Sequence, residues 1–355
     1  MPIPTEPIGS IPRPQALIEG VQAFGSGRIT RQDLDSLYES AVRETIRLFE
    51  ATGSPVITDG EQTKPSFATY PIHGLKNLVP DGVTIPFADG HTRQLPRLAS
   101  GPFRYRTYAD VYLEEAQKHA HLPVKQAVIS ASALSLLYPS SGIEGYSRDT
   151  FIQDLLHENE TDIRRCLQSG ASSVQIDFTE GRLSVKLDPT RQLLKNFVAL
   201  NNQVLERFSA EERYKIGVHT CPGGDKDSTH SADVDYAHLL PDLFELKAGS
   251  FYIQLASESD RRQVLAIIKK HLKADQKVFV GVTDPINPLV ETEEEIRDRV
   301  FEAAEYIPLN QLGTTDDCGF SPFGDDTSTP RETAFAKIRA RVVGTGLAAQ
   351  KLGLR

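Results

Sequence analysis

The sequence predicts an α/β fold, a (β/α)8 barrel formed by a single domain over residues 1–355, with an inserted hairpin or loop region near residues 61–108. Short apolar runs alternate with stretches of helical period along almost the whole chain, and most of these runs end in polar residues. Largely apolar strands that alternate with amphipathic helices are typical of parallel strands covered by helices. An open doubly wound sheet is the competing fold, but the chain lacks the Gly-x-Gly-x-x-Gly turn that would support it.

The strands and helices are predicted from hydrophobic period and from capping residues. The eight predicted strands end, in chain order, at Ser10, Gly60, Ser132, Phe178, Cys221, Ser257, Asp284 and Cys318. The predicted amphipathic helices span residues 31–51, 148–168, 189–208, 234–246, 261–272, 292–306 and 331–352. Ser147 precedes one helix and Thr329-Pro330 precedes the last, as expected of helix starts.

Residues 61–108 interrupt this alternation. The segment is rich in Pro, Gly and aromatic residues and is too long for a plain connection. Segments of this kind are usually functional or carry a hairpin of their own.

Composition excludes several classes of protein. The net charge is −9 with no basic stripe, which argues against a nucleic-acid partner. No apolar run reaches membrane length, the first residues do not resemble a signal peptide, and three cysteines do not form a disulfide framework. We expect a cytoplasmic chain with reduced thiols that acts on small molecules. Its oligomeric state is open, with a homo-oligomer among the alternatives.

Metal-binding residue types stand at the ends of two predicted strands. His219 and Cys221 are two residues apart in GVHTC, so on a strand both side chains point to the same side. Cys318 ends the last strand, and the strand ends of such a barrel converge on one mouth. One His and two Cys with a free fourth position form a catalytic zinc set, although both cysteines could instead be ordinary buried apolar residues. Cys166 lies on the buried face of a predicted helix and is interpreted as a core residue.

This ligand set indicates a particular chemistry. Zinc bound by two thiolates can hold a third thiolate and keep it nucleophilic, and the substrate thiol loses its proton on binding. Alkylation of a thiol therefore suits the set better than hydrolysis.

Six motifs in order then resemble a known family. They are IGSIPRP at Ile8, TDGEQ at Thr58, VQIDF at Val174, GVHTC at Gly217, GVTDPINP at Gly281 and DDCG at Asp316. The chain resembles, over nearly its whole length, the catalytic C-terminal domain of cobalamin-independent methionine synthase, within the zinc-dependent thiol alkyltransferases. The fold that this resemblance implies is again a (β/α)8 barrel.

The resemblance implies roles for individual residues. His219, Cys221 and Cys318 match the zinc ligands, and Ser10, Glu61 and Asp177 match residues that hold the carboxylate and amino group of homocysteine. The family's further Glu ligand is replaced by Gln254, and its DIHSP motif becomes DPINP, which retains Asp284 but has Ile286 at the His position. Asp284 is therefore a candidate catalytic residue, together with His230 on the loop after the zinc strand. EGRLSVKLDP, from Glu180, is interpreted as a flap whose Arg182 or Lys186 either meets an anionic substrate or is solvated.

The implied function is zinc-dependent methyl transfer to a thiol such as homocysteine, in methionine biosynthesis. The donor is left open between a methyl-folate, a corrinoid protein and another methylated metabolite. One alternative is zinc- or acid-assisted epoxide opening or rearrangement, or thiol–epoxide alkyl transfer, on the same scaffold. Another is a non-enzymatic protein: a zinc-storing or metallochaperone protein, or a vestigial barrel.

Overall fold

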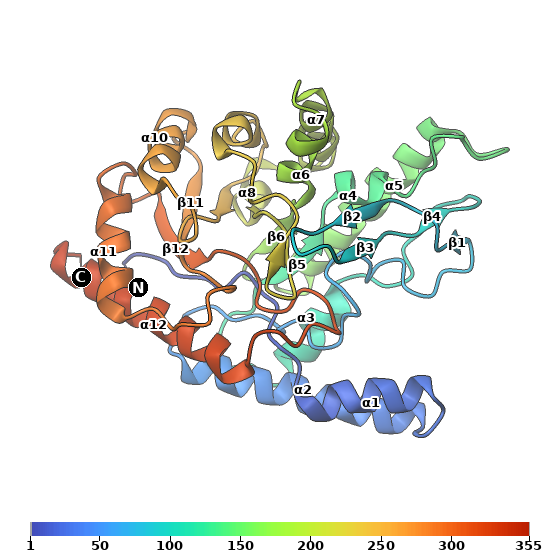
Figure 1. Ribbon diagram of the computed structural model, residues 1–355, viewed down its shortest axis with the longest axis horizontal. Helices are drawn as coiled ribbons and strands as arrows, with labels where there is room; N and C mark the ends of the chain where they lie inside the picture. The colour runs from blue at the N-terminus through green and yellow to red at the C-terminus, as the bar shows by residue number, and fades with distance from the viewer. Residues whose placement is uncertain (1, 355) are drawn as a thin grey trace.

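A computed structural model describes residues 2–354 of the chain, and its centre is a parallel sheet (Figure 1). Within these residues the sheet has six strands in the order β12-β11-β10-β7-β6-β5. The strands are β5 (Gln126–Ile129), β6 (Val174–Asp177), β7 (Ile216–Thr220), β10 (Ser250–Ile253), β11 (Lys277–Thr283) and β12 (Leu312–Asp316). Their residues are almost all buried, as expected of parallel strands covered by helices.

The first two predicted strands are extended segments that each add one parallel bridge to an edge of this sheet. Thr5 pairs with Thr314 of β12, and Ile57 pairs with Val124 just before β5. The two segments also contact each other, because the Ile11 amide donates to the carbonyl of Gly60 at 3.0 Å. The chain therefore follows the predicted (β/α)8 path, with two strand positions occupied by extended segments.

Helices lie between the strands and surround the sheet (Figure 1). The long helices are α2 (Arg31–Ala51), α5 (Arg148–Gln168), α7 (Gln192–Leu205), α10 (Arg261–His271), α11 (Glu293–Ala304) and α12 (Arg331–Lys351). Shorter ones are α1 (Gln15–Gly25), α3 (Asp110–Gln117), α4 (Ala131–Ser135), α6 (Glu180–Leu187), α8 (Ala210–Tyr214), α9 (Leu240–Leu243) and the 3-10 helix η1 (Tyr236–His238). Side chains at the helix starts accept backbone N–H groups, including Thr30 before α2, Ser147 before α5 and Thr292 before α11.

Three predicted elements differ from the structure. The strand predicted to end at Ser132 ends at Ile129, and Ser132 lies in helix α4. The expected helix over residues 234–246 is split into η1 and α9, because Pro241 lies in the first turn of α9 and has no N–H to continue an earlier helix. The expected flap after Asp177 is helix α6. Arg182 of this helix is buried and donates to Glu258 at 2.7 Å and to the Ala232 and Val234 carbonyls. This contact with a distant segment fixes α6 against the body of the barrel.

The inserted segment contains short antiparallel strands, as predicted. β2 (Thr84–Pro86) pairs with β3 (Thr92–Gln94), and β1 (Leu78–Val79) pairs with β4 (Arg97–Leu98). The turn of the β2–β3 hairpin lies against the loop after β7, which forms its own pair of strands, β8 (Gly224–Asp225) and β9 (Ser228–Thr229). Ala88 donates to the Thr229 carbonyl at 2.9 Å, so the insert reaches across to the loop that follows the predicted zinc strand.

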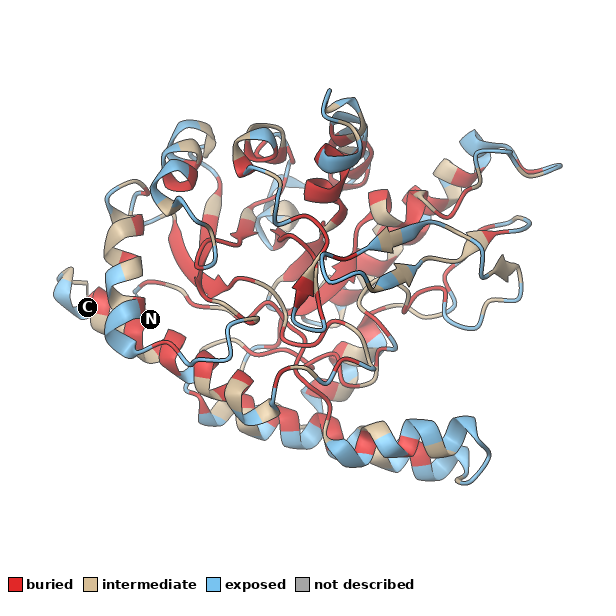
Figure 2. Ribbon diagram, in the orientation of Figure 1, coloured by how far each residue is buried: buried red, intermediate tan, exposed pale blue. Residues whose placement is uncertain are grey.

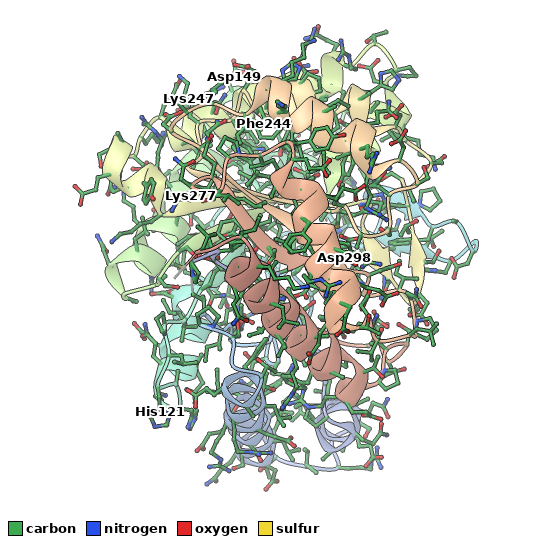
Figure 3. The ribbon with its side chains drawn as sticks, turned by 90° about the vertical axis from the view of Figure 1, so that its left-hand side faces the viewer. His121, Asp149, Phe244, Lys247, Lys277 and Asp298 are labelled. Atoms are coloured by element: carbon green, nitrogen blue, oxygen red, sulfur yellow. The ribbon has the colours of Figure 1, made fainter. Side chains whose placement is uncertain are left out.

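One large apolar cluster fills the space between the strands and the helices, and buried residues follow the inner faces of both (Figure 2). Cys166 belongs to this cluster and is fully buried, which confirms it as a core residue. The outer side carries exposed charged residues such as Lys247 and Asp298 (Figure 3). Among residues 2–354, no helix is both long and apolar enough to cross a membrane.

Candidate active site

Three side chains from two distant parts of the barrel meet in a possible metal-binding group. His219 lies on β7, Cys221 follows β7, and Cys318 follows β12. One ligand atom from each lies within 4.8 Å of the others. The sequence separation of 97 residues between the two cysteines is bridged by the barrel, which places their sulfur atoms 3.0 Å apart.

The imidazole of His219 is oriented for a ligand. Its Nδ1 lies 3.2 Å from the carbonyl oxygen of Tyr252 on the neighbouring strand β10, so Nδ1 carries the proton and donates it. Nε2 is then the free nitrogen, and it is buried with no hydrogen-bond partner among residues 2–354. A second hydrogen bond that fixes the tautomer is typical of a histidine that binds a metal ion. The group therefore fits a zinc ion.

The two thiols have different proton affinities. The hydrogen bond from Cys221, followed by the nearby His219 imidazole, holds the pKa of Cys318 well below its usual range. The same hydrogen bond, together with burial, raises the pKa of Cys221. Backbone N–H groups of the Gly223-Gly224 turn also point at the sulfur atoms, with Gly223 N 3.4 Å from Cys221 Sγ. A cation held between the sulfurs would replace the shared proton.

Ser10, Glu61 and Asp177 lie on the same side of the barrel, and all three are buried. Asp177 ends β6 directly beside His219 in the parallel register, and burial raises its pKa to about 7, with Glu61 adding to the rise. Glu61 Oε1 accepts from Lys64 Nζ at 3.0 Å. Its backbone has φ of 54°, a left-handed conformation that is uncommon for Glu and is frequent at functional sites.

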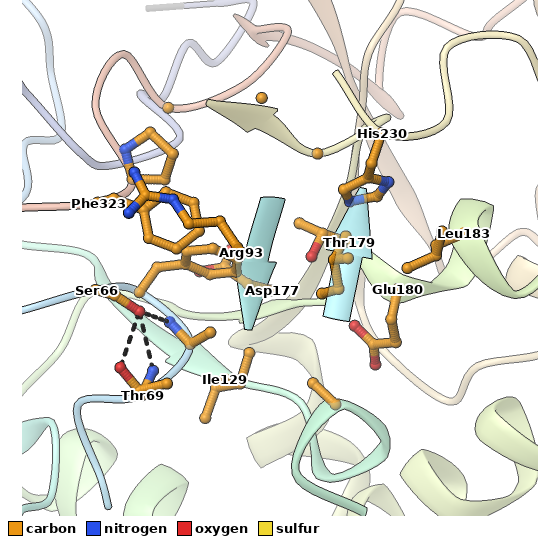
Figure 4. Close-up of a pocket in the computed structure, with 18 of the residues that line it drawn as sticks. Ser66, Thr69, Arg93, Ile129, Asp177, Thr179, Glu180, Leu183, His230 and Phe323 are labelled. Atoms are coloured by element: carbon orange, nitrogen blue, oxygen red, sulfur yellow. Dashed lines mark hydrogen bonds between the residues drawn. The ribbon is translucent and has the colours of Figure 1, made fainter. Parts of the chain in front are cut away.

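A cavity of about 330 Å³ lies between these residues, and Figure 4 shows part of its wall, with Asp177 and His230. Its wall includes six of the eight site residues predicted from sequence: Ser10, Glu61, Asp177, His219, His230 and Cys318. Cys221 is not one of the residues of this wall, but its sulfur lies 3.0 Å from that of Cys318. Much of the remaining wall is apolar or aromatic and includes Phe87 of the insert and Phe323 of the loop after Cys318. We refer to this space as the inner cavity.

A second cavity, of about 460 Å³, adjoins the inner cavity. Cys318 and Gly224 line both. Asp284, which is half-buried, faces this second cavity together with Gln254 and Asp317. The structure thus places the predicted catalytic residue Asp284 on the other side of Cys318 from Ser10, Glu61 and Asp177.

His230 is buried. Its ring packs over Gly223, where an added Cβ would lie 1.8 Å from Nε2, and Nδ1 is 2.8 Å from the hydroxyl of Ser231. Burial, with Lys186 and Arg182 nearby, lowers its pKa to about 4. His230 is therefore a neutral imidazole near neutral pH.

Gln254 makes hydrogen bonds of its own. Its amide nitrogen donates to Ser257 Oγ at 2.6 Å, and its oxygen lies 3.5 Å from a nitrogen of the Arg182 guanidinium. Arg182 itself is almost fully buried and stacks over Tyr236, with the guanidinium carbon 4.2 Å from the ring centre. Lys186 donates to the His230 carbonyl and to Asp233, each at 3.0 Å. Arg182 and Lys186 thus connect α6 to the loop after β7, and neither lines the inner cavity.

Sequence reasoning missed two contributions to the inner cavity. Glu180 was assigned to a flap, yet it is buried in the cavity wall. Arg93, from the insert, pairs with Asp225 and Asp325 and lies over Phe323 with the guanidinium carbon 4.1 Å from the ring centre. The aromatic and proline-rich composition of residues 61–108 was the available signal for a functional insert, but it did not indicate which residue would enter the site.

Comparison with protein families decides the relationship. The sequence model of the family described as cobalamin-independent synthase, catalytic domain, matches residues 3–340. The chain belongs to this family. Among curated members, it is 22% identical over 350 residues to a methionine synthase of Sulfurisphaera tokodaii, with 99% of this chain and 94% of that protein covered. It is 24% identical over 353 residues to a methionine synthase of Sulfolobus acidocaldarius, with 99% and 93% covered.

Solved structures agree on the family fold. A B12-independent methionine synthase from Shewanella, in complex with selenomethionine, superposes with a TM-score of 0.78 at 18% identity, over 99% of this chain and 98% of that chain. A protein of Listeria monocytogenes described as a putative vitamin-B12 independent methionine synthase gives a TM-score of 0.70 at 22% identity, with 96% of each chain covered. The resemblance found in the six sequence motifs is thereby confirmed at the level of family and fold.

Proposed function

We propose that this chain is a zinc-dependent methyltransferase that transfers a methyl group to the thiol of homocysteine. One observation carries the proposal: His219 Nε2 is a buried nitrogen without a partner among residues 2–354, and the two thiols lie within 4.8 Å of a ligand nitrogen of this ring at the wall of the inner cavity. Family membership and the methionine synthase names of the relatives support the same reaction class. The Shewanella relative, solved with selenomethionine, supports an amino acid of this shape as ligand.

His219, Cys221 and Cys318 would hold the zinc ion. Zinc bound by two thiolates lowers the pKa of a third thiol and keeps its sulfur nucleophilic. The chain's own contribution is to orient the ligands. The Tyr252 carbonyl fixes the His219 tautomer, and the Gly223-Gly224 turn directs N–H groups at the sulfur atoms.

Ser10, Glu61 and Asp177 would hold the amino-acid part of homocysteine. A hydroxyl suits the carboxylate, and two acidic side chains suit the ammonium group. Asp177, whose pKa is about 7 when it is buried without a cationic ligand, would ionise as the ammonium group binds. These contacts would keep the thiol next to Cys318 and lower the entropy cost of the reaction.

Asp284 and His230 would assist the methyl transfer from two different cavities. Asp284 faces the second cavity, on the other side of Cys318 from the inner cavity. His230 faces the inner cavity as a neutral imidazole, which suits hydrogen bonding to a substrate better than proton donation.

The first test is metal content. The reduced protein, Cys221→Ala, Cys318→Ala and Cys166→Ala would be purified in parallel and their zinc per chain measured. Cys166→Ala is the matched control, because it removes a thiol of the apolar core that does not belong to the ligand group. We expect about one zinc in the wild type and in the control, and its loss from the other two variants.

The second test is thiol activation. Addition of homocysteine to the zinc-loaded protein is expected to release a proton, and products from N-methyl donors and from epoxides would then be compared. Methylated product supports methyl transfer, whereas a thioether formed only from epoxides supports the alternative reaction on this scaffold. Zinc content that is indifferent to both cysteines would rule out the proposed site.

A further inference from the structure

Glu180 is a buried acidic side chain of the inner cavity that the proposed function leaves without a role. It stands at the start of α6, is 6% exposed and lines the cavity (Figure 4). Its Oε1 accepts hydrogen bonds from the hydroxyls of Ser130, at 2.5 Å, and Ser132. Its Oε2 is buried and has no hydrogen-bond partner within the described residues 2–354.

The hydrogen bonds of the two serines determine which carboxyl oxygen of Glu180 carries its proton. Ser130 Oγ already accepts the Ala133 amide at 3.0 Å, and Ser132 Oγ accepts the Asn201 side-chain amide at 2.8 Å. Each hydroxyl therefore has its proton free to donate to Oε1. Oε1 is saturated as an acceptor, so the proton of a neutral Glu180 is carried by Oε2.

The surroundings favour this neutral form. Ala133, Leu136, Leu183 and Phe197 supply apolar wall on the α4, α6 and α7 side of the cavity. Burial raises the pKa of Glu180 to about 7, and the nearby Asp177 carboxylate adds to the rise. A buried carboxylic acid with its proton in a reaction cavity is suited to general acid catalysis.

We propose that Glu180 is the catalytic acid that protonates the leaving nitrogen of an N-methyl donor. The thiolate sulfur of homocysteine attacks the methyl carbon, so the S–C bond forms and the C–N bond breaks. The nitrogen keeps the electron pair of that bond and takes the proton from Glu180 Oε2. Glu180 is left as a carboxylate and regains a proton from solvent, while the thiol proton was released on binding. The inference rests on the proposed function.

This assignment would supply a proton in a chain that has Ile286 where the resembling family motif has a histidine. Asp284, the retained member of that motif, faces the second cavity, and His230 is unprotonated near neutral pH. Glu180 is the group in the inner cavity whose proton position is fixed by its neighbours.

The test compares two donors on the zinc-loaded protein with homocysteine bound. 5-Methyltetrahydrofolate has a nitrogen leaving group that needs a proton, whereas iodide leaves methyl iodide without one. Glu180→Gln keeps the size of the side chain and an oxygen for the two serines but has no acidic proton. We expect this variant to lose at least about 100-fold in rate with the folate donor and to stay within about twofold with methyl iodide.

Asp162→Asn is the matched control, because it makes the same change at a buried carboxyl that does not line the cavity. Both of its rates are expected to stay within about twofold of the wild type. If Glu180→Gln does not fold, Glu180→Asp would serve, since it withdraws the acid by one methylene and should show the same split between donors.

Three outcomes would overturn the inference. Equal losses with both donors would make Glu180 a positioning residue, and no loss with the folate donor would make it dispensable. A wild type that uses methyl iodide but no N-methyl donor would exclude the proposed leaving atom. Failure of the methyl iodide reaction in the wild type would instead contradict thiol activation, and with it the proposed function.

Discussion

The ion pair between Lys64 and Glu61 is buried at the wall of the inner cavity. Both side chains are at most 3% exposed, and Lys64 also donates to the Ala127 carbonyl at 2.9 Å. Removing one partner of a buried pair leaves the other charge uncompensated. We expect Lys64→Met to lower the free energy of unfolding by about 3–5 kcal/mol, measured by urea denaturation.

The double variant Glu61→Gln, Lys64→Met provides the control. It removes both charges, so most of the lost stability should return even though homocysteine binding would be impaired. A double variant as unstable as Lys64→Met would show that lost packing, and not the unpaired charge of Glu61, causes the effect.

At the scale of single residues, the sequence predicted best those side chains whose position follows from the alternation of side chains along a strand. The two-residue spacing of His219 and Cys221 and the position of Cys318 at a strand end were enough to bring these residues together. Glu180 could not be found in this way. Its role depends on Ser130, Ser132 and Asn201, which belong to other elements and meet it only in the folded chain.

At the scale of elements, Asp162 links α5 to the inserted segment. It is fully buried, accepts the Ala109 amide at 2.6 Å, and also accepts the hydroxyl of Tyr70. Burial raises its pKa from 3.8 to about 6. Between these values the folded chain keeps a proton that the unfolded chain has lost, so stability falls as the pH rises.

Asp162→Asn tests this link, because it abolishes the titration at that position. The rise in the pKa of Asp162 from 3.8 to about 6 corresponds to about 3 kcal/mol of unfolding free energy. We therefore expect the wild type to lose about 3 kcal/mol relative to Asp162→Asn between about pH 4 and about pH 6, followed by urea unfolding at each pH. A difference between the two proteins that does not change with pH would contradict the assigned pKa.

Elements with local signals were predicted, and elements made by distant contacts were not. α2 and α5 carry capping residues and a regular apolar face, and both were expected at their observed bounds. The length of β1–β4 is only two or three residues each, so their sequence could indicate a hairpin region but no strand bounds. α6 is held by Arg182 and Glu258, which are 76 residues apart, and no local pattern reports such a contact.

At the scale of the whole molecule, Arg13 joins the three parts of the chain that close the barrel. Its guanidinium is buried and donates to the carbonyls of Glu61 and Lys64, at 2.6 and 3.1 Å, in the segment after the second strand position. It also donates to the carbonyls of Ser321 and Phe323 in the loop after Cys318. The first segment, which carries Ser10, is thereby fastened to both of its neighbours.

These contacts of Arg13 explain why the extended segments at two strand positions need few backbone hydrogen bonds to the neighbouring strands. The segments at Thr5 and Ile57 each make a single bridge, while Arg13 donates to backbone carbonyls in both segments that neighbour its own. A planar guanidinium can reach two segments at once, whereas the single ammonium group of lysine cannot reproduce that fork.

Arg13→Lys is therefore not a conservative change. It keeps the charge but should lose at least two charge-assisted hydrogen bonds, which lowers the free energy of unfolding by about 3 kcal/mol. Arg43→Lys is the matched control, since the Arg43 side chain is 59% exposed and pairs with Glu39 on its own helix. Its effect should be within about 0.5 kcal/mol.

Because Ser10 and Cys318 both flank segments that Arg13 holds, homocysteine affinity should fall in Arg13→Lys alone, measured by calorimetry on the zinc-loaded proteins. Equal stability of the two variants would show that the barrel closes without this residue.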